Sequence, residues 1–316
     1  MTKTNGPTGP GAKRPGTLLP LILLSYFTIY IVWGSTYYFS KVAVSTIPAF
    51  TVLGWRFFIG GSVFLLFALL TVRLKKRPTL KEIAASVFMG TFLLLGGTGL
   101  VTVAVRKVDS YLAALIIASI PIAVAFFDRV LIKKKISLVM AGGILLGLLG
   151  VAFLMYNGRS IRTSFNLEML MLIGASVSWA FATSLGHRIK VHPDSLVNSA
   201  IQMLFVGFIC LAGMEISGPG RLMQFSGFSV SSILSVLYLA LVGSLAFIAY
   251  NFLLKHEPSL RIVSYVFVTP LIAILFGFIL GHEKSVPYLF NGLALILSGL
   301  FLMLYGGHFL RMIGKN

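Results

Sequence analysis

Long apolar runs separated by short polar segments dominate the pattern of this chain. A membrane-spanning helix needs about 20 mostly apolar residues, because it rises 1.5 Å per residue through roughly 30 Å of hydrocarbon. The pattern therefore predicts an all-α integral membrane protein with ten transmembrane helices. These are expected to begin near Leu18, Ala49, Ile83, Ser110, Leu138, Leu167, Ser195, Val230, Ile262 and Val286.

Composition supports a membrane protein and excludes several other classes. Of the 316 residues, 57% are hydrophobic and 11% are charged, whereas soluble domains are about 25% charged. The net charge of +18 comes from short basic clusters between apolar runs, so no continuous nucleic-acid-binding face is expected. Only eight residues are acidic and one is a cysteine, Cys210. Because no nucleophile–base pair or metal-ligand spacing lies in the apolar runs, we predict no enzyme activity, metal or cofactor.

The distribution of Lys and Arg predicts the orientation, because basic residues favour the cytoplasmic side of a membrane. With the N-terminus inside, the inner segments hold roughly three times as many basic residues as the outer loops. Residues 1–17 are rich in Gly, Pro, Lys and Thr and are predicted to form a disordered cytoplasmic tail. Residues 307–316 are predicted to form a cytoplasmic tail at the other end of the chain. We expect a multi-pass protein in the lipid bilayer of a bacterial inner membrane, with both termini in the cytoplasm.

The two halves of the chain carry matching residues. An offset of 149 relates Pro121 to Pro270, and an offset of 146 near the start of each half relates Trp33 to Trp179. Because each half would contain five helices, the second copy would be inserted upside down. We therefore predict two inverted repeats, residues 18–156 and 167–306, joined by an outer linker at 157–166. Transporters of this architecture bind substrate near the midplane and expose it to each side in turn.

Several motifs resemble the EamA-type carriers of the drug/metabolite transporter superfamily. They are W-G-S-T-Y-Y-F-S-K at Trp33–Lys41 followed by Trp55 and Arg56, then S-Y-V-F-V-T-P at Ser264–Pro270, L-G-H-E-K at Leu280–Lys284 and N-G-L-A-L-I-L-S-G at Asn291–Gly299. The resemblance implies ten helices in two inverted repeats around a central cavity. It also implies transport, often export, of amino acids or other small metabolites, without naming the substrate. The first half has Lys134 where the second has Glu283, so that acid is not expected to have a core transport role.

Charged residues inside predicted spans are the strongest candidates for a site, since a Lys or Arg at a helix centre costs about 2.5 to 3.5 kcal/mol to insert. Arg56 lies roughly 10 Å into the second span. A structural role, with bonds to backbone carbonyls, and a role in a substrate cavity are equally open. Lys41 lies nearer the outer end, where its side chain can reach the interface. No acidic residue lies in the middle of a predicted span, which favours a zwitterion or anion over a cation and disfavours a proton antiporter.

Trp33 and Trp179 lie in the middle of their spans, away from the interfacial belts where membrane Trp residues gather. Their matching positions predict paired walls of one cavity, although ordinary packing also places Trp residues there. The other candidates for substrate binding carry hydroxyl, amide or aromatic groups, and Ser and Thr among them can also bond their own helix. They are Ser35, Thr36, Tyr37, Thr183, Gln202, Tyr250, Asn251 and Tyr265.

Four residues are predicted to act in gating. Lys41 and His187 are counterparts at opposite mouths of the cavity; His187 is otherwise a polar residue at the end of a helix. Pro121 and Pro270 are predicted to kink the fourth and ninth spans, as hinges or as simple curves. Close helix packing is predicted for the glycines of the fifth span, namely Gly142, Gly143, Gly147 and Gly150.

The sequence thus predicts a secondary transporter for a small organic metabolite, an amino acid or a related zwitterion or anion. Alternating access through a central cavity is the expected mechanism and export the expected direction. The alternatives are an exporter of drugs or lipophilic compounds and, less favoured, a channel. The lipid bilayer and a small-molecule substrate are the predicted partners, no nucleic acid is expected, and a homodimer stays open.

Overall fold

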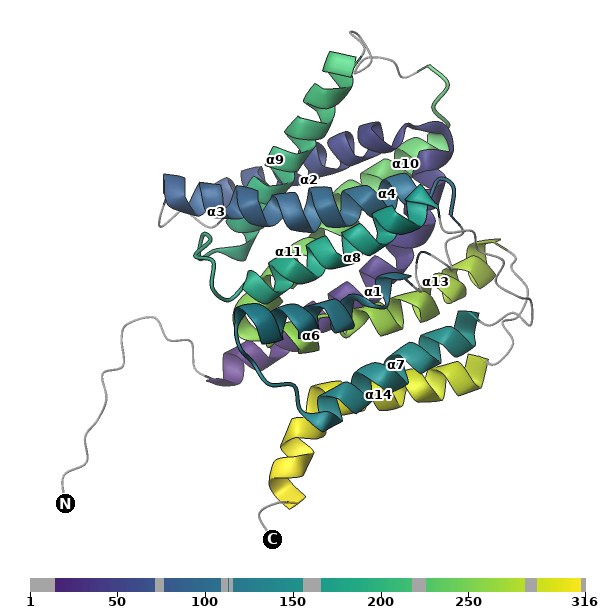
Figure 1. Ribbon diagram of the computed structural model, residues 1–316. Helices are drawn as coiled ribbons and strands as arrows, with labels where there is room; N and C mark the ends of the chain where they lie inside the picture. Colours follow the sequence, from purple (N-terminus) through teal and green to yellow (C-terminus); the bar gives the residue numbers. More distant parts are fainter. Residues whose placement is uncertain are drawn as a thin grey trace, which may run out of the picture.

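The computed structural model describes residues 15–71, 77–108, 113, 116–155, 166–217, 226–281 and 289–313, and every regular element in these segments is a helix (Figure 1). Five helices begin at the residues expected from the apolar runs: α2 (Ala49–Thr71), α7 (Leu138–Met155), α8 (Leu167–Leu185), α9 (Ser195–Ser217) and α10 (Val230–Tyr238). The first helix, α1 (Pro15–Thr46), begins slightly before the predicted end of the tail. The predicted starts near Ser110 and Val286, most of the linker and most of the N-terminal tail lie outside the described residues, whereas residues 307–313 of the predicted C-terminal tail are helical.

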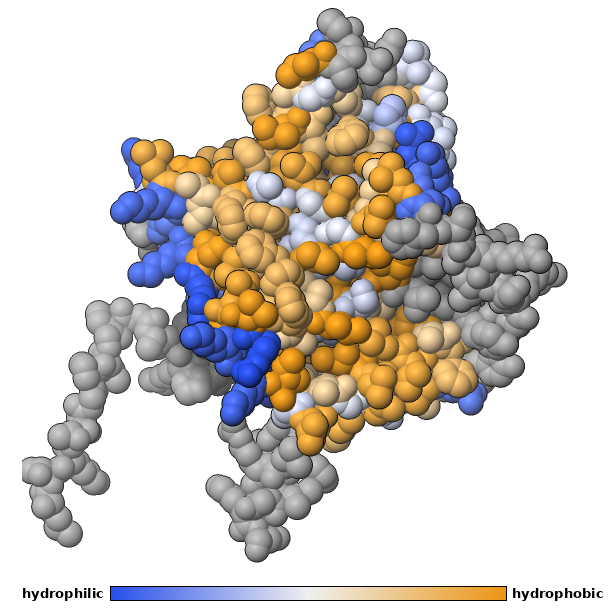
Figure 2. All heavy atoms as spheres, in the orientation of Figure 1, coloured by the Kyte–Doolittle hydropathy of each residue, from blue (hydrophilic) through white to orange (hydrophobic). Residues whose placement is uncertain are grey.

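The described helices are those of a multi-pass membrane protein. Six helical segments are long and apolar enough to cross a membrane: Leu18–Thr46, Ala49–Thr71, Leu80–Ala104, Leu167–Leu185, Ser195–Ile216 and Val230–His256. Three shorter apolar helices are Leu138–Phe153, Ser259–Ile272 and Asn291–Tyr305. Apolar side chains cover most of the visible surface. Polar ones form a row at the left edge, where α3 (Leu80–Gly90) begins and where α6 (Ile120–Leu131) and α8 end, and a smaller group at the upper right (Figures 1 and 2). The predicted all-α integral membrane fold is confirmed; the count of ten helices stays a prediction.

Two of the spanning segments contain a π-helical turn. In the first, α3 continues into η1 (Thr91–Gly99) and α4 (Leu100–Ala104); in the second, α10 continues into η3 (Leu239–Gly243) and α11 (Ser244–His256). A π-turn widens the helix locally, is rare, and is often found at functional sites. Both occur near glycines, and both face the interior of the bundle, where Leu93, Gly97 and Gly243 are buried.

The most extensive helix packing joins elements that are far apart in sequence. α1 packs on α13 (Tyr265–Gly281), α8 on α6, α2 on α9, and α7 on α14 (Leu289–Ile313). Two of these contacts need glycine, because a Cβ at Gly207 would lie 2.5 Å from the backbone nitrogen of Phe58, and one at Gly299 would lie 2.6 Å from that of Gly147. The packing role predicted for the fifth-span glycines agrees with the geometry at Gly143, Gly147 and Gly150. It is wrong for Gly142, since a Cβ there would meet nothing within 4 Å.

The two prolines predicted to kink helices lie in different settings. Pro121 is at the start of α6, directly after a turn at Ala118–Ser119, and there its missing N–H removes no helical hydrogen bond. The predicted kink is therefore a break that precedes the proline. Pro270 lies inside α13, and a turn at Val263–Ser264 separates that helix from the short α12 (Ser259–Ile262). Because Pro270 cannot donate to the carbonyl four residues earlier, that of Val266 is left free, and the Thr269 hydroxyl donates to it at 3.4 Å.

Candidate functional site

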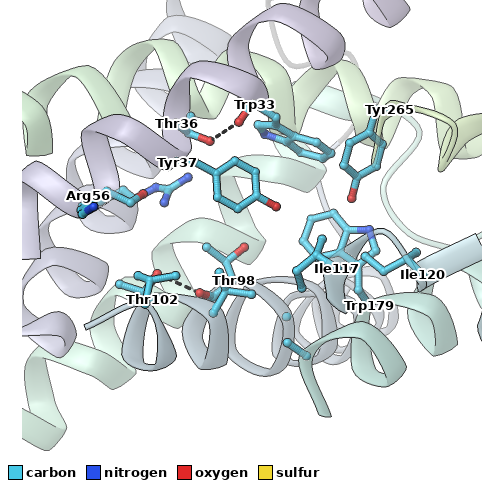
Figure 3. Close-up of a pocket in the computed structure, with 16 residues that line it drawn as sticks. Trp33, Thr36, Tyr37, Arg56, Thr98, Thr102, Ile117, Ile120, Trp179 and Tyr265 are labelled. Atoms are coloured by element: carbon cyan, nitrogen blue, oxygen red, sulfur yellow. Dashed lines mark hydrogen bonds between the residues drawn. The ribbon is translucent and has the colours of Figure 1, made fainter. Parts of the chain in front are cut away.

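A cavity of about 850 Å³, part of it open to solvent, lies between α1, α2, the η1–α4 segment, α6, α8 and α13 (Figure 3). Lys41 is exposed and marks the open end. The lining consists of Trp33, Thr36, Tyr37, Ser40, Lys41, Arg56, Gly97, Thr98, Val101, Thr102, Val105, Ile117, Ile120, Ala175, Trp179 and Tyr265.

One face of α1 supplies five of these side chains. Trp33, Thr36, Tyr37, Ser40 and Lys41 follow the spacing i, i+3, i+4, i+7, i+8 that aligns residues along one side of a helix. The Thr36 hydroxyl donates to the Trp33 carbonyl at 2.8 Å, so its oxygen keeps lone pairs that can accept from a ligand. This stripe runs from an aromatic residue deep in the protein to a cation at the surface.

Aromatic side chains form the deep end of the cavity. The Trp33 ring packs edge-on against Trp179 and Tyr265, with ring centroids 5.4 and 4.6 Å apart. Tyr250 lies behind them, 5.1 Å from both Trp rings and fully buried. It accepts a hydrogen bond of 2.9 Å from Trp179 Nε1, and its hydroxyl lies 2.6 Å from that of Thr183. The cluster is therefore fixed both by ring packing and by hydrogen bonds.

The π-turn in η1 gives Trp179 its position. A Cβ at Gly97 would lie 2.6 Å from Cε3 of Trp179, so only glycine lets the ring approach the helix this closely. The neighbouring Thr98 and Thr102 both line the cavity, and the Thr102 hydroxyl donates to the Thr98 carbonyl at 2.8 Å. The η1–α4 segment thus supplies both the gap that admits the aromatic ring and two hydroxyl groups in the wall.

Arg56 lies at the other end of the cavity from the aromatic residues (Figure 3). It is 7% exposed, and its Nε atom is buried without a hydrogen-bond partner. Across the described segments, no carboxylate or backbone carbonyl accepts a hydrogen bond from its guanidinium, whose carbon lies 4.9 Å from the centroid of the Phe57 ring. A buried cation without a counter-ion is costly. Of the two roles considered for Arg56, the geometry favours the cavity.

Five of the predicted substrate-binding residues are not in the cavity wall. Ser35 faces α10, with its hydroxyl 2.7 Å from that of Tyr238, while Tyr250 and Thr183 lie behind the aromatic cluster. Gln202 and Asn251 belong to a buried amide network in which Gln202 Nε2 donates to the Oδ1 atoms of Asn198 and Asn251, at 3.0 and 3.2 Å. These five, Ser35, Thr183, Gln202, Tyr250 and Asn251, therefore do not meet the cavity in this conformation.

The structure also adds residues that the sequence alone did not single out. Ser40 follows from the helical spacing of the α1 stripe, whereas Thr98, Thr102, Ile117 and Ile120 line the cavity only because helices distant in sequence converge. His187, the predicted counterpart of Lys41, is exposed just beyond the end of α8.

Asp128, which the sequence places at a membrane boundary, is 0% exposed in α6. The hydroxyls of Ser184 and Ser259 face its carboxylate, but neither carboxylate oxygen has a hydrogen-bond partner of standard geometry among the described residues. This buried acid lies outside the cavity wall.

Comparison with known proteins identifies the family. Residues 20–156 and 166–305 both match the EamA-like transporter family. This chain belongs to that family. The uncharacterized inner membrane transporter YedA of Escherichia coli K12 is 35% identical over 92% of each chain, and the uncharacterized transporter YoaV of Bacillus subtilis is 23% identical over 89% of this chain and 96% of its own.

The comparisons reach beyond bacteria and include a solved fold. A WAT1-related chloroplastic protein of Arabidopsis thaliana is 26% identical over 91% of this chain and 70% of its own. One crystal structure, 20% identical, superposes with a TM-score of 0.71 over 92% of this chain and 98% of that chain. The EamA resemblance is thus confirmed, and the chain is a multi-pass membrane transporter by family.

Proposed function

We propose that this EamA-family protein is a secondary transporter that moves a small organic metabolite, an amino acid or related zwitterion or anion, by alternating access. The observation that carries the proposal is the cavity, which joins a buried, unpaired guanidinium at Arg56 to an aromatic floor at Trp33, Trp179 and Tyr265. A carboxylate would give Arg56 the counter-ion that the protein itself does not provide. The substrate's apolar part would pack on the rings.

The packing of the helices supports the proposal of two inverted repeats of five helices. α1 runs parallel to α13, as shown by the contacts of Tyr30 with Ser264 and of Gly34 with Ile272, and α8 runs parallel to α6. The remaining pairs, α2 with α9 and α7 with α14, are antiparallel. A two-fold axis that exchanges the two halves would map the α1–α13 pair onto the α8–α6 pair. The same axis would map the α2–α9 pair and the α7–α14 pair each onto itself.

Exposed cations support the proposed orientation. Arg129, Lys133, Arg188 and Lys190 are exposed where α6 and α8 end, and Lys81 is exposed where α3 begins, which is the edge where polar groups gather in Figure 2. Basic residues favour the cytoplasmic side. The cavity then opens outward, and export would require the opposite side to open so that substrate enters from the cytoplasm.

On the closed side, buried contacts hold the end of α8 against α11. Tyr37 lines the open cavity, whereas its counterpart at the offset of 146, Thr183, is fully buried and bonded to Tyr250. In the same region Gly186 packs on Leu254, since a Cβ at Gly186 would lie 3.1 Å from the Cδ2 atom of Leu254. In the inward-open state we expect α8 and α11 to separate here, so that Thr183 lines an open cavity as Tyr37 does now.

Cysteine labelling from either side of the membrane tests this function. Cys210, the single native cysteine, is buried and is first changed, Cys210→Ala; Tyr37→Cys and Thr183→Cys are then made separately. An impermeant maleimide should label Tyr37→Cys only from outside and Thr183→Cys only from inside. No labelling of Thr183→Cys from either side would contradict alternating access, and labelling of it from outside would indicate a channel. A carrier must also exchange substrate across the membrane of proteoliposomes, at a rate that saturates as the substrate concentration rises.

An exporter of lipophilic or cationic drugs is the weaker alternative. The aromatic floor would suit such compounds, but Arg56 and Lys41 give the cavity a positive charge, and the described residues that line it include no acid. A cationic compound would therefore be repelled by the side chains that define the polar part of this site.

A further inference from the structure

We infer that the substrate of this cavity is a monoanionic carboxylate with a compact apolar or aromatic body and no amino group beside the carboxylate. The inference rests on the proposed function and narrows it, since it excludes the zwitterions that the proposed function admits. Three properties of the cavity carry it: its charge inventory, the separation of its two ends, and the hydrogen-bonding state of its hydroxyls.

The charge inventory is one-sided. The described residues of the lining include two cations, Arg56 and Lys41, and no acidic residue. Six of the eight acidic residues in the chain are described, and all lie elsewhere: Glu82 in the cap of α3, Glu168 paired with Lys107, Asp194 at the start of α9, Glu257 beside Tyr26, Glu215 near the end of α9, and Asp128 buried in α6. An ammonium group bound in this cavity would find no counter-ion among them.

The hydroxyl groups in the wall do not replace that counter-ion. Thr36 and Thr102 each donate their proton to a carbonyl of their own helix, which leaves neutral oxygen lone pairs facing the cavity. These lone pairs can accept from an ammonium but cannot neutralise its charge. Moving an ammonium from water into such a site is unfavourable, because desolvation of a charge is only partly offset by neutral hydrogen bonds. Repulsion by Arg56 and Lys41 adds to this cost.

A carboxylate meets the opposite situation. Arg56 has a buried Nε donor without a partner, and a charge-assisted hydrogen bond to a carboxylate is roughly twice as strong as a neutral one. The partial compensation that Arg56 now has is the face of the Phe57 ring at 4.9 Å, and such a contact is weaker than an ion pair. Arg56 is therefore a desolvated cation that has no counter-ion among the described residues. A bound carboxylate would supply that counter-ion.

The distance between the two ends limits the size of the body. A Cβ placed on Gly243 would lie 3.5 Å from Arg56 Nη2 and 3.6 Å from Thr36 Cγ2. The guanidinium and the Thr36 side chain are therefore neighbours, at the same height along the axis of α1. Thr36 follows Trp33 by three residues, which is roughly 4.5 Å along α1. A ring joined to a carboxylate through one or two carbons spans a distance of this order. The apolar Val101, Ile117 and Ile120 complete the wall around such a body.

The aromatic cluster is the strongest argument for the rival case, in which it holds an ammonium by cation–π interaction. In this cluster, however, the rings contact one another edge-on or tilted, with centroids 4.6 to 5.4 Å apart around Trp33. Trp179 Nε1 is directed at Tyr250, and Gly97 lies against the other side of the Trp179 ring system. The ring faces are therefore largely occupied by protein, which suits edge contacts with an apolar body better than a cage around a cation.

A matched set of three probes tests the inference on the purified full-length protein in detergent. 3-Phenylpropanoate, L-phenylalanine and phenethylamine share a phenyl ring and a short carbon chain and differ in carrying the anion, both charges or the cation. Because two of the three Trp residues line the cavity, binding is read from Trp fluorescence and, independently, from thermal stabilisation. We expect 3-phenylpropanoate to bind at least tenfold more tightly than L-phenylalanine, and phenethylamine more weakly still. Acetate, which lacks the body, should not bind over the same concentration range.

Variants assign the selectivity to the cavity. Arg56→Gln should weaken 3-phenylpropanoate binding at least tenfold and leave phenethylamine binding unchanged or tighter. The three probes should then no longer differ in affinity in the order expected for the wild-type protein. Lys81→Gln removes an exposed cation at the start of α3 and should leave the order unchanged. Should Arg56→Gln fail to fold, the order in the wild-type protein still decides. The inference is overturned if L-phenylalanine or phenethylamine binds as tightly as 3-phenylpropanoate, or if none of the three binds.

The two proposals can fail separately, because these binding measurements need no membrane. If the probe order is as expected but Thr183→Cys is never labelled from inside, alternating access is wrong while the anion site stands. If the labelling alternates but the probe order is reversed or absent, the transport proposal stands and the substrate class proposed here is wrong.

Discussion

Replacing Gly207 with alanine should destabilise the protein through the α2–α9 contact. The added Cβ would lie 2.5 Å from Phe58 N, 2.9 Å from Phe58 Cα and 3.1 Å from the carbonyl oxygen of Gly54. All three atoms are backbone, so no side-chain rotation can relieve the overlap. Ordinary contact begins at 3.4 Å, and the two helices must therefore separate by about 0.9 Å at this point. Overpacking of this kind typically costs about 1 to 3 kcal/mol.

The same helix offers a matched control at Gly213, where a Cβ would meet nothing within 4 Å. Gly213→Ala should therefore be neutral or stabilising by up to about 1 kcal/mol, because alanine is the better helix former. Unfolding of both variants by denaturant in detergent micelles measures the difference. Phe58 follows Arg56 by two residues in α2, so Gly207→Ala should also weaken binding of 3-phenylpropanoate. If Gly207→Ala is as stable as Gly213→Ala, the close approach of these helices is not as the structure describes it.

Three further predictions follow from other parts of the fold. Tyr250→Phe should lower the free energy of unfolding by about 1 to 3 kcal/mol, because it leaves the buried Trp179 Nε1–H without its acceptor. Asp128→Asn should raise the free energy of unfolding at pH 8 by about 1 kcal/mol or more, since it replaces a fully buried carboxylate, whose oxygens make no hydrogen bond of standard geometry with the described residues, by a neutral group of the same shape. In oriented vesicles, Lys133→Cys should react with an impermeant maleimide only from the cytoplasmic side and Arg106→Cys only from outside, as the distribution of basic residues requires.

Each of these predictions has a control and an outcome that contradicts it. Tyr305→Phe removes a hydroxyl from a side chain that is 54% exposed and should have little effect; equal losses for the two Tyr variants would refute the role given to the buried hydrogen bond. A large destabilisation by Asp128→Asn would mean that the carboxylate has a stabilising partner. The labelling is done in the Cys210→Ala background, and reaction of Lys133→Cys from outside would reverse the proposed orientation.

Sequence reasoning succeeded where a single physical constraint acts on one helix. The thickness of the membrane sets the length of apolar runs, and α7, α8 and α9 begin where those runs begin. The cost of inserting a cation selected Arg56. Helix α3 begins at Leu80 rather than near Ile83 because Thr79 and Glu82 form a capping box, a signal that the printed sequence contains as T-x-x-E.

Sequence reasoning fell short where the answer depends on which helices meet. The offset of 146 would pair Arg56 with Gln202, yet only Arg56 lines the cavity, because Gln202 is held in the buried amide network with Asn198 and Asn251. Thr98 enters the wall through the π-turn of η1, which has no distinctive local pattern. Asp128 is hidden by packing of α6 with α8 and α12, and such packing cannot be deduced from the apolar run that contains it.

Helices of the first half pack on helices of the second half, so they complete their packing only after the second half has been synthesised. α1 completes its packing only when α13 exists, and α2 waits for α9. Ribosomes add about 5 to 20 residues per second, and some 220 residues separate the end of α1 from the start of α13, so α1 spends roughly 11 to 44 s in the bilayer before its partner is synthesised. During that interval the Arg56 side chain lies in an incomplete bundle, because the cavity that it lines also needs residues of α8 and α13. A chain truncated after α7 would lack the partners of α1, α2 and α7, whereas the two halves expressed as separate polypeptides retain the surfaces of all three contacts.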